Sequence, residues 1–414
     1  MASSDRDSPG RGDHRRWSSA PGGGSRLTVS PSPARGQRAL TRLLSEGSSP
    51  EAVDQLLREH PVPIIDGPTC TFLWRGEADW VGVEHRMLGV PIPLPLRRLK
   101  GTDLWHASVE LPRGARIQYR LLVRRGEHTE SMNDPLNPRV VGDPVGSQSV
   151  LEADGYITPD WTHPDPAAVA GELVDLRLPS KALSREAHVT LYVPSRMRRD
   201  RRMPLLVVHD GGDFLHFSSM GTVLDNLMHR RLIADCVVVF THPGDRLREY
   251  GASTAHSRFL TNELVPKIEG TLQLQSDPRG RVLMGASFGG VAALAAAVRA
   301  PGFYGGLLLE SPSLRFTEAA TPGTFGEVFE PVVRFVNSVR ASPKKVTDRI
   351  FLTFGAFEPL AVPDRAMVGA LERACGDLRV VEALDGHNWI NWRDRLLDGL
   401  GWLFPGEARL IYPG

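Results

Sequence analysis

The spacing of apolar residues changes along this chain of 414 residues, and each change predicts a different kind of structure. Between residues 37 and 60, leucines and valines recur at spacings of three and four, which predicts a helical segment of two short helices. Ser49 and Pro50 suit the N-cap and first turn of the second helix. Residues 1–36 are mainly Ser, Gly, Pro and Arg, and we expect a disordered tail because they offer too little apolar surface to offset the entropy of ordering.

From residue 61 to 158, apolar and polar residues alternate with a period of two. Short alternating runs near 69–74, 107–111 and 117–123 are separated by clusters of Gly, Pro and Asp. Several short strands at this spacing predict a small β-sandwich domain. Three tryptophans of this region could form a ligand-stacking face, but filling the sandwich core and its rim is the favoured interpretation: Trp74, Trp80 and Trp105.

Residues 159–168 have the composition of a linker, and after them strands alternate with helices over residues 169–410. The candidate strands lie near 171–178, 187–193, 204–209, 236–241, 281–284, 305–310, 349–354 and 379–384. The middle strands are continuously apolar, as expected for strands that are covered on both faces. This alternation predicts an α/β fold, with a mostly parallel sheet between helices and the size of an α/β-hydrolase domain.

One segment of this second domain places a serine between a strand and a helix. Residues 282–284 form an apolar strand core, and residues 285–289 read Gly-Ala-Ser-Phe-Gly, which matches the pattern G-x-S-x-G. The glycines permit a sharp turn, and the alanine-rich helix that follows can lie close to a sheet. Because this arrangement exposes a serine hydroxyl at the edge of an α/β-hydrolase sheet, Ser287 is the candidate nucleophile.

A serine hydroxyl needs a base to remove its proton and an acidic group to orient that base. In this fold both partners follow the serine along the chain. His387 is the only histidine after Ser287 and lies beyond the last predicted strand, so it is the candidate base. Glu358 directly follows a predicted strand and is the preferred acid. Asp364, which could merely cap a helix, and Asp385, two residues before the histidine, remain alternatives.

Acyl transfer also requires N–H donors for the developing oxyanion. The first donor is the backbone N–H of the residue after the nucleophile, Phe288. The second usually comes from the loop after an earlier strand, which here contains two consecutive glycines. We assign this donor to Gly212, with Gly211 as the alternative. Four other histidines near this sheet edge are each expected to be surface or structural residues: His209, His216, His242 and His256.

Composition narrows the possible partners. The net charge of +1 gives no argument for nucleic acid or an anionic membrane surface as a partner, and no apolar stretch approaches the length of a membrane span. The N-terminus lacks the apolar core of a secretory signal. Cys70, Cys236 and Cys375 are far apart, which fits a reducing, cytoplasmic location. No HExxH motif, Cys/His ligand cluster or phosphate loop is present, so we expect neither a metal nor an organic cofactor.

Several motifs together resemble one known family. Those of the second domain lie at 205–214, 245–250, 259–266, 285–290 and 386–389, and they are similar to the enterochelin esterase and esterase D group of α/β-hydrolases. The first domain, through 72–74, 102–105, 119–121 and 134–138, is similar to the β-sandwich module that precedes the catalytic domain in enterochelin esterases. Such modules also resemble early-set, immunoglobulin-like domains of glycogen-acting enzymes.

The resemblance implies a serine esterase that cleaves carboxylic esters, in the namesake enzymes those of a ferric tri-catecholate siderophore. The family's serine, acid and histidine map onto Ser287, Glu358 and His387. An anionic siderophore would favour a basic site entrance, which Arg246 and Arg248 could provide unless they pair with Glu249 or other surface acids. Two alternatives remain: an acyltransferase that uses the same acyl-enzyme, and a glycan-binding or regulatory protein whose hydrolase domain is vestigial.

Overall fold

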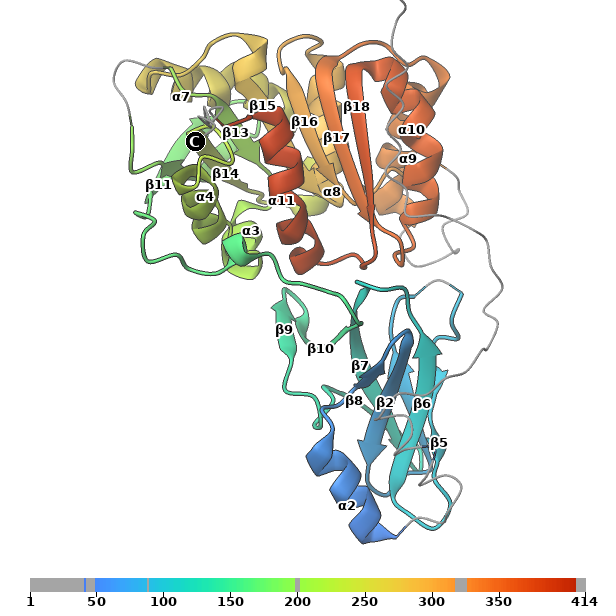
Figure 1. The fold of residues 1–414 in the computed structure, drawn as a ribbon. Coiled ribbons are helices and arrows are strands. Elements are labelled where there is room, and N and C mark those ends of the chain that lie inside the picture. Colours follow the sequence, from blue (N-terminus) through green and yellow to red (C-terminus); the bar gives the residue numbers. More distant parts are fainter. Residues whose placement is uncertain (1–40, 42–48, 88, 198–201, 317–325, 407–414) are drawn as a thin grey trace, which may run out of the picture.

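The computed structural model describes residues 41, 49–87, 89–197, 202–316 and 326–406 (Figure 1). The predicted tail, nearly all of the first predicted helix and residues 407–410 lie outside this part of the chain. The second predicted helix is α2 (Pro50–Glu59), and the hydroxyl of Ser49 accepts the N–H of Ala52 at 3.3 Å as its N-cap. Val53 and Leu56 anchor this helix, because both are buried against the nearby β-strands.

The strands that follow form two antiparallel sheets, as the period-two pattern predicts. The first has the order β1 (Ile64–Asp66), β2 (Thr69–Arg75), β6 (Leu104–Glu110) and β5 (Arg97–Arg98). The second has the order β4 (Leu94–Pro95), β3 (Trp80–Glu84), β7 (Arg116–Arg125), β10 (Gly146–Glu152) and β9 (Val140–Asp143), and β8 (His128–Met132) pairs with β7. Apolar side chains from both sheets share one core, so the two sheets pack as a sandwich.

The tryptophans of this region mainly fill that core. Trp74 and Trp105 are buried, with ring centroids 6.5 Å apart. Trp80 is half-buried, and the guanidinium of Arg124 lies 5.6 Å from the centre of its ring. Core filling is therefore confirmed for Trp74 and Trp105, and a stacking face made by all three rings is not.

The described residues from 172 onward hold an eight-stranded sheet. Its order is β11 (Glu172–Ser180), β12 (Arg185–Val193), β14 (Val237–His242), β13 (Leu205–Val208), β15 (Arg281–Ala286), β16 (Gly306–Glu310), β17 (Thr347–Gly355) and β18 (Cys375–Ala383). In this order the strands from β14 to β18 run parallel, and at one side of the sheet β12 is antiparallel to both of its neighbours, β14 and β11. The predicted mostly parallel sheet is confirmed.

Helices cover both faces of this sheet (Figure 1). One face packs against α3 (Gly211–Phe217), α4 (Met220–His229) and α11 (Trp389–Leu403). The other packs against α5 (Arg246–Tyr250), α6 (Thr254–Arg258), α7 (Val265–Thr271), α8 (Phe288–Arg299), α9 (Gly326–Ala341) and α10 (Ala361–Ala374). Successive strand residues supply both cores, since side chains alternate between faces: Leu206 and Val208 point to the first, Leu205 and Val207 to the second.

The sandwich contacts the large sheet near the carboxyl end of β18. The buried guanidinium of Arg116 on β7 lies 3.0 Å from Asn388 Oδ1 and 3.3 Å from Asp385 Oδ2, and its backbone N–H donates to the carbonyl of Leu384 at 2.9 Å. Figure 1 shows the sandwich at this edge of the sheet. Because ligands of open α/β sheets bind at the carboxyl ends of the strands, the sandwich lies beside the expected site. In the described residues, no helix combines the length and apolar character needed to cross a membrane.

Candidate active site

Ser287 lies at a sharp turn between β15 and α8. Its backbone has φ 54° and ψ −120°, a strained conformation for a residue other than glycine. Two backbone hydrogen bonds hold the turn, because the N–H of Ser287 donates to Glu310 at 3.0 Å and its carbonyl accepts from Ser313 at 3.0 Å. The predicted strand, turn and helix are therefore present, and the turn presents the serine hydroxyl at the carboxyl edge of the sheet.

The glycines around the serine are required by close packing. A Cβ on Gly285 would lie 2.3 Å from the backbone of Gly289, and a Cβ on Gly289 would lie 2.9 Å from Cβ of His209. A Cβ on Gly290 would come within 2.7 Å of Pro312. Any side chain at these positions would push α8 away from β15 and from the neighbouring loops, and would displace the serine.

His387 and Glu358 are brought together, as the sequence predicts. His387 Nδ1 makes a short hydrogen bond with Glu358 Oε2, and the other carboxylate oxygen accepts the N–H of Gly355 at 2.6 Å. Glu358 is completely buried, and the imidazole packs edge-on against Trp392 with ring centroids 5.0 Å apart. With the Nδ1 proton directed to the carboxylate, Nε2 is left as the basic nitrogen.

The two alternative acids have other environments. Burial, and to a lesser extent the charge of Glu358, raises the pKa of Asp364 well above its usual value, and neither carboxyl oxygen of Asp364 has a hydrogen-bond partner. Asp385 accepts hydrogen bonds from Arg116, from the side chain of Asn388 and from the N–H of Gly386. Asp385 therefore joins the sandwich to the large sheet, and Glu358 is the carboxylate that contacts the imidazole.

No hydrogen bond joins the hydroxyl of Ser287 to the imidazole of His387. Among the described residues the hydrogen-bond partner of the Ser287 hydroxyl is the hydroxyl of Ser313, at 3.2 Å. Ser287, Glu358 and His387 follow the carboxyl ends of β15, β17 and β18, so all three lie at one edge of the sheet. Catalytic hydrogen bonds are often loose before substrate binds, and this arrangement is compatible with a nucleophile that turns from Ser313 toward the base.

Both predicted oxyanion donors lie at helix N-termini. Phe288 is the first residue of α8, while Gly211 and Gly212 begin α3, and N–H groups at these positions have no partner within their helix. A Cβ on Gly289 would lie 3.3 Å from Asp210 Oδ2, which shows that the first turn of α8 adjoins the loop before α3. Gly211 is buried, with no room for a Cβ beneath Phe240, whereas Gly212 is half-exposed.

Arg246 and Arg248 differ in their surroundings. Arg246 donates two hydrogen bonds of 2.7 Å to the carboxylate of buried Asp210, and its guanidinium lies 5.9 Å from the ring centre of Phe288. The acid that pairs with Arg246 is thus not Glu249, which binds Arg185 instead. Arg248 is exposed on α5. Through its bonds to Asp210, Arg246 stabilises the loop that precedes Gly212. Arg246 also lies beside the candidate site, because it is close to Phe288.

A buried histidine pair beneath this loop was not foreseen. His209 Nδ1 lies 2.8 Å from the carbonyl of Met284 and donates to it, so Nε2 of His209 accepts from Nε2 of His256 at 3.1 Å. Burial lowers the pKa of His209 to about 4 and that of His256 well below its usual value. Both rings pack against Tyr250, whose hydroxyl accepts the N–H of Asp210 at 3.2 Å. No sequence motif links these histidines.

The histidine pair predicts acid sensitivity. In the unfolded chain both groups titrate near pH 6.5, whereas in the folded protein burial lowers the pKa of His209 to about 4 and that of His256 well below its usual value. The unfolded state therefore binds more protons in this window, and the free energy of unfolding falls as the pH drops from about 6.5 toward 4. We expect His256→Gln, which retains an N–H donor, to lose less stability between pH 7 and pH 5 than the wild type in urea unfolding. The control is His128→Gln, which replaces an exposed histidine. An equal loss of stability in the wild type and in His256→Gln would contradict this account.

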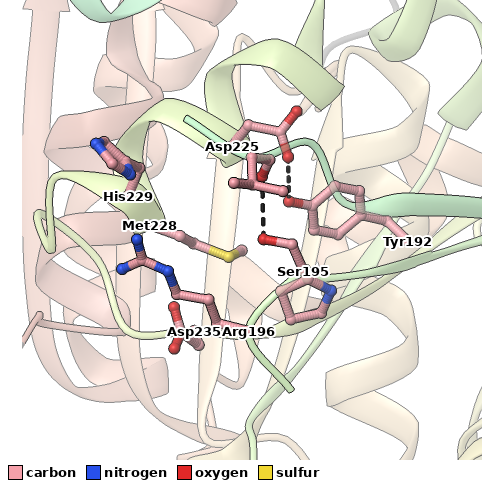
Figure 2. Close-up of a pocket in the computed structure, with 9 residues that line it drawn as sticks. Tyr192, Ser195, Arg196, Asp225, Met228, His229 and Asp235 are labelled. Carbon is pink, nitrogen blue, oxygen red and sulfur yellow. Dashed lines mark hydrogen bonds between the residues drawn. The ribbon is translucent and has the colours of Figure 1, made fainter. Parts of the chain in front are cut away.

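A cavity of about 220 Å³ lies between the sandwich and the large sheet, with His387 in its wall. The sandwich contributes polar and charged side chains, among them Arg86, Gln118 and Gln148, and the hydrolase region contributes the rings of Phe357 and Trp389. A separate hollow of about 10 Å³ is lined by Tyr192 and Asp225, whose side chains share a hydrogen bond of 2.7 Å (Figure 2). The hollow has room for about one water molecule and lies at the amino edge of the parallel strands, away from Ser287.

The mostly parallel sheet, the strained serine turn and the His387–Glu358 pair define an α/β-hydrolase. Residues 180–403, more than half of the chain, match the family described as putative esterase, and the protein belongs to this family. Residues 69–161 match the N-terminal domain of enterochelin esterase. The chain is thus an enterochelin esterase-like hydrolase that acts on ester bonds.

Curated relatives match over most of their length. An iron(III) enterobactin esterase of Dickeya dadantii is 25% identical over an alignment of 423 positions that covers 89% of this chain and 96% of that protein. An iron(III) salmochelin esterase of Escherichia coli O6:H1 is 27% identical over an alignment of 372 positions that covers 80% of this chain and 87% of that protein. The crystal structure of a Shigella flexneri enterobactin esterase in the presence of enterobactin aligns with a TM-score of 0.65 and 22% identity, covering 81% of this chain and 92% of that one. This last likeness supports the fold.

Proposed function

We propose that this protein is a serine esterase that cleaves the ester bonds of a ferric siderophore of the enterochelin type, with Ser287, His387 and Glu358 as its triad. The observation that carries the triad is the buried Glu358 carboxylate bound to His387 Nδ1 at the same sheet edge as the serine turn. The relatives named as enterobactin and salmochelin esterases support the substrate class. They favour neither the acyltransferase nor the non-catalytic alternative.

Each group has a definite part in the proposed reaction. Nε2 of His387 takes the hydroxyl proton as Ser287 Oγ attacks the ester carbonyl carbon, and Glu358 stabilises the resulting imidazolium. The N–H groups of Phe288 and Gly212 donate to the oxyanion. His387 then protonates the leaving alkoxide, which gives a free alcohol and an acyl-serine. Water, deprotonated by the same nitrogen, attacks the acyl-serine, and His387 returns that proton to Ser287 Oγ as the carboxylic acid is released.

The cavity beside His387 suits an anionic, aromatic substrate. Aromatic rings of Phe357 and Trp389 can stack on catechol rings, while the exposed guanidinium of Arg86 supplies positive charge from the sandwich. Arg246 and Arg248 are further candidates for attracting the anion, and the exposed Arg248 is the freer of the two to move toward it. We therefore propose that the sandwich forms one wall of the substrate site.

This proposal predicts a charge-selective effect of Arg86→Gln. We expect KM for ferric enterobactin to rise about two- to five-fold, because one solvent-exposed charge contributes roughly 0.5–1 kcal/mol. KM for a neutral aryl ester should not change. Steady-state kinetics with both substrates measure this, and Arg113→Gln, which removes an exposed arginine outside the cavity, is the matched control. Equal changes with both substrates would remove Arg86 from the substrate site.

The substrate class is tested by incubating the purified protein with ferric enterobactin and following the products by liquid chromatography. We expect release of 2,3-dihydroxybenzoyl-serine units. A protein that hydrolyses a simple aryl ester but leaves ferric and iron-free enterobactin intact would be an esterase with a different substrate.

We also propose a cytoplasmic location, which is supported by Cys70, Cys236 and Cys375, all buried free thiols. Cell fractionation tests the location.

A further inference from the structure

Three neighbouring strands bring two imidazoles and a carboxylate together at the antiparallel side of the large sheet. In the strand register, Asp175 on β11 lies opposite Thr190 on β12, and His188 on β12 lies opposite His242 on β14. Thr190 and His188 are two residues apart, so all four side chains lie on one face of the sheet. One ligand atom from each of Asp175, His188 and His242 lies within 4.8 Å of the other two.

The side chains of this cluster converge on the carboxylate. The rings of His188 and His242 stack with centroids 4.2 Å apart and planes inclined by 19°. Nε2 of His188 lies 3.3 Å from Asp175 Oδ1, and the Thr190 hydroxyl lies 2.6 Å from the same oxygen and 2.8 Å from Nε2 of His242. The hydroxyl has one proton, which it donates to Asp175, so it accepts from His242. Both Nε2 atoms therefore face the same small volume beside Asp175.

We propose that Asp175, His188 and His242 form a binding site for a first-row divalent metal ion, of which Zn²⁺ fits the donor set best. Two imidazole nitrogens and one carboxylate oxygen are ordinary Zn²⁺ ligands, and water can complete a tetrahedral shell. Each imidazole must present an unprotonated Nε2 to the metal, so binding would shift the proton of His188 and of His242 from Nε2 to Nδ1 through solvent and would draw the partly exposed side chains slightly closer. Thr190 would remain bonded to Asp175 and hold it in position. The site goes beyond the proposed esterase activity, because it uses no residue of the triad.

The residues around the cluster show which strands a bound metal ion would link and which nearby charge would oppose it. A metal ion here would link the β11–β12 hairpin to β14, the strand that connects it to the parallel part of the sheet. Nδ1 of His242 lies 3.2 Å from the position of a Cβ on Gly212, so the site adjoins the first turn of α3. Arg177 lies opposite His188 and is exposed, and its positive charge opposes a cation. Removal of that charge should therefore strengthen metal binding.

Calorimetric titration of chelator-treated protein with Zn²⁺ tests the site. We expect one ion per chain, and binding at least about tenfold weaker in His188→Ala and in His242→Ala. Arg177→Gln should bind Zn²⁺ more tightly than the wild type, and His128→Ala, which changes an exposed histidine elsewhere, should bind equally. The proposal would be overturned if the wild-type protein did not bind one Zn²⁺ ion per chain. It would also be overturned if the double variant His188→Ala/His242→Ala still bound Zn²⁺ as the wild type does.

Two measurements keep this result separate from misfolding and from the esterase proposal. Substitution of Co²⁺ into wild-type protein should give the strong visible bands of a four- or five-coordinate ion, and only the weak bands of the hydrated ion would count against the site. The Ser287→Ala variant should bind Zn²⁺ as the wild type does. Metal binding thus succeeds or fails independently of ester hydrolysis.

Discussion

Replacement of Ser287 by alanine should lower kcat for an aryl ester by a factor on the order of 10⁶ and leave the protein folded. The size of the loss reflects the removal of the nucleophile itself, after which only transition-state binding by the remaining site is left. The hydroxyl is half-exposed and makes one side-chain hydrogen bond, to Ser313, so its removal disturbs little packing. Steady-state kinetics and a thermal unfolding curve measure the two parts of this prediction.

Ser313→Ala is the matched control, because the hydroxyl of Ser313 is the hydrogen-bond partner of Ser287 Oγ. We expect this variant to retain activity within about tenfold of the wild type, since it loses only a hydrogen bond to the resting nucleophile. If Ser287→Ala kept more than about a hundredth of the activity, the assignment of the nucleophile would be wrong. A loss in Ser313→Ala as large as that expected for Ser287→Ala would point to Ser313.

Replacement of Glu358 by glutamine should lower kcat by a factor on the order of 10⁴, with little change in KM. A neutral amide cannot stabilise the imidazolium, and it no longer enforces the tautomer that leaves Nε2 basic. The residue is completely buried and receives the N–H of Gly355, so the isosteric amide is the variant that least disturbs the loop. Single-turnover kinetics with an aryl ester separate this loss in the chemical step from any change in binding.

Asp364→Asn and Asp385→Asn distinguish Glu358 from its two rivals. Burial raises the pKa of Asp364 well above its usual value and neither of its carboxyl oxygens has a hydrogen-bond partner, so its amide should retain activity within about tenfold. Asp385 binds Arg116, and its amide should mainly lower the free energy of unfolding because the buried guanidinium loses its counter-charge. A larger loss of kcat in either variant than in Glu358→Gln would assign the acid to that residue instead.

Much of the fold could be predicted because it depends on local patterns. Continuous apolar runs such as 205–208 form strands covered on both faces. The Gly-Ala-Ser-Phe-Gly motif forms the predicted turn, between the strand before Ser287 and the helix after it. Chain order restricted the base to His387, and Glu358 lies against it. These features follow from neighbouring residues or from the topology of the fold, both of which are accessible without coordinates.

The features that sequence reasoning missed arise from contacts between distant segments. The role of Asp385 depends on Arg116, which belongs to the other domain, and the bond between Arg246 and Asp210 joins two loops. The cluster of Asp175, His188 and His242 matches no metal-binding motif because its members are spread over three strands and meet only through the sheet register. Periodicity and short motifs contain no information on such pairings.

The central claim, that Ser287 is the nucleophile of this esterase, is tested most directly by a fluorophosphonate probe followed by peptide mapping. We predict a single covalent adduct per chain, on the peptide that contains Ser287, with labelling strongly slowed in His387→Ala because the base is absent. Labelling of a different residue, or no labelling of folded protein that is active on esters, would contradict the account.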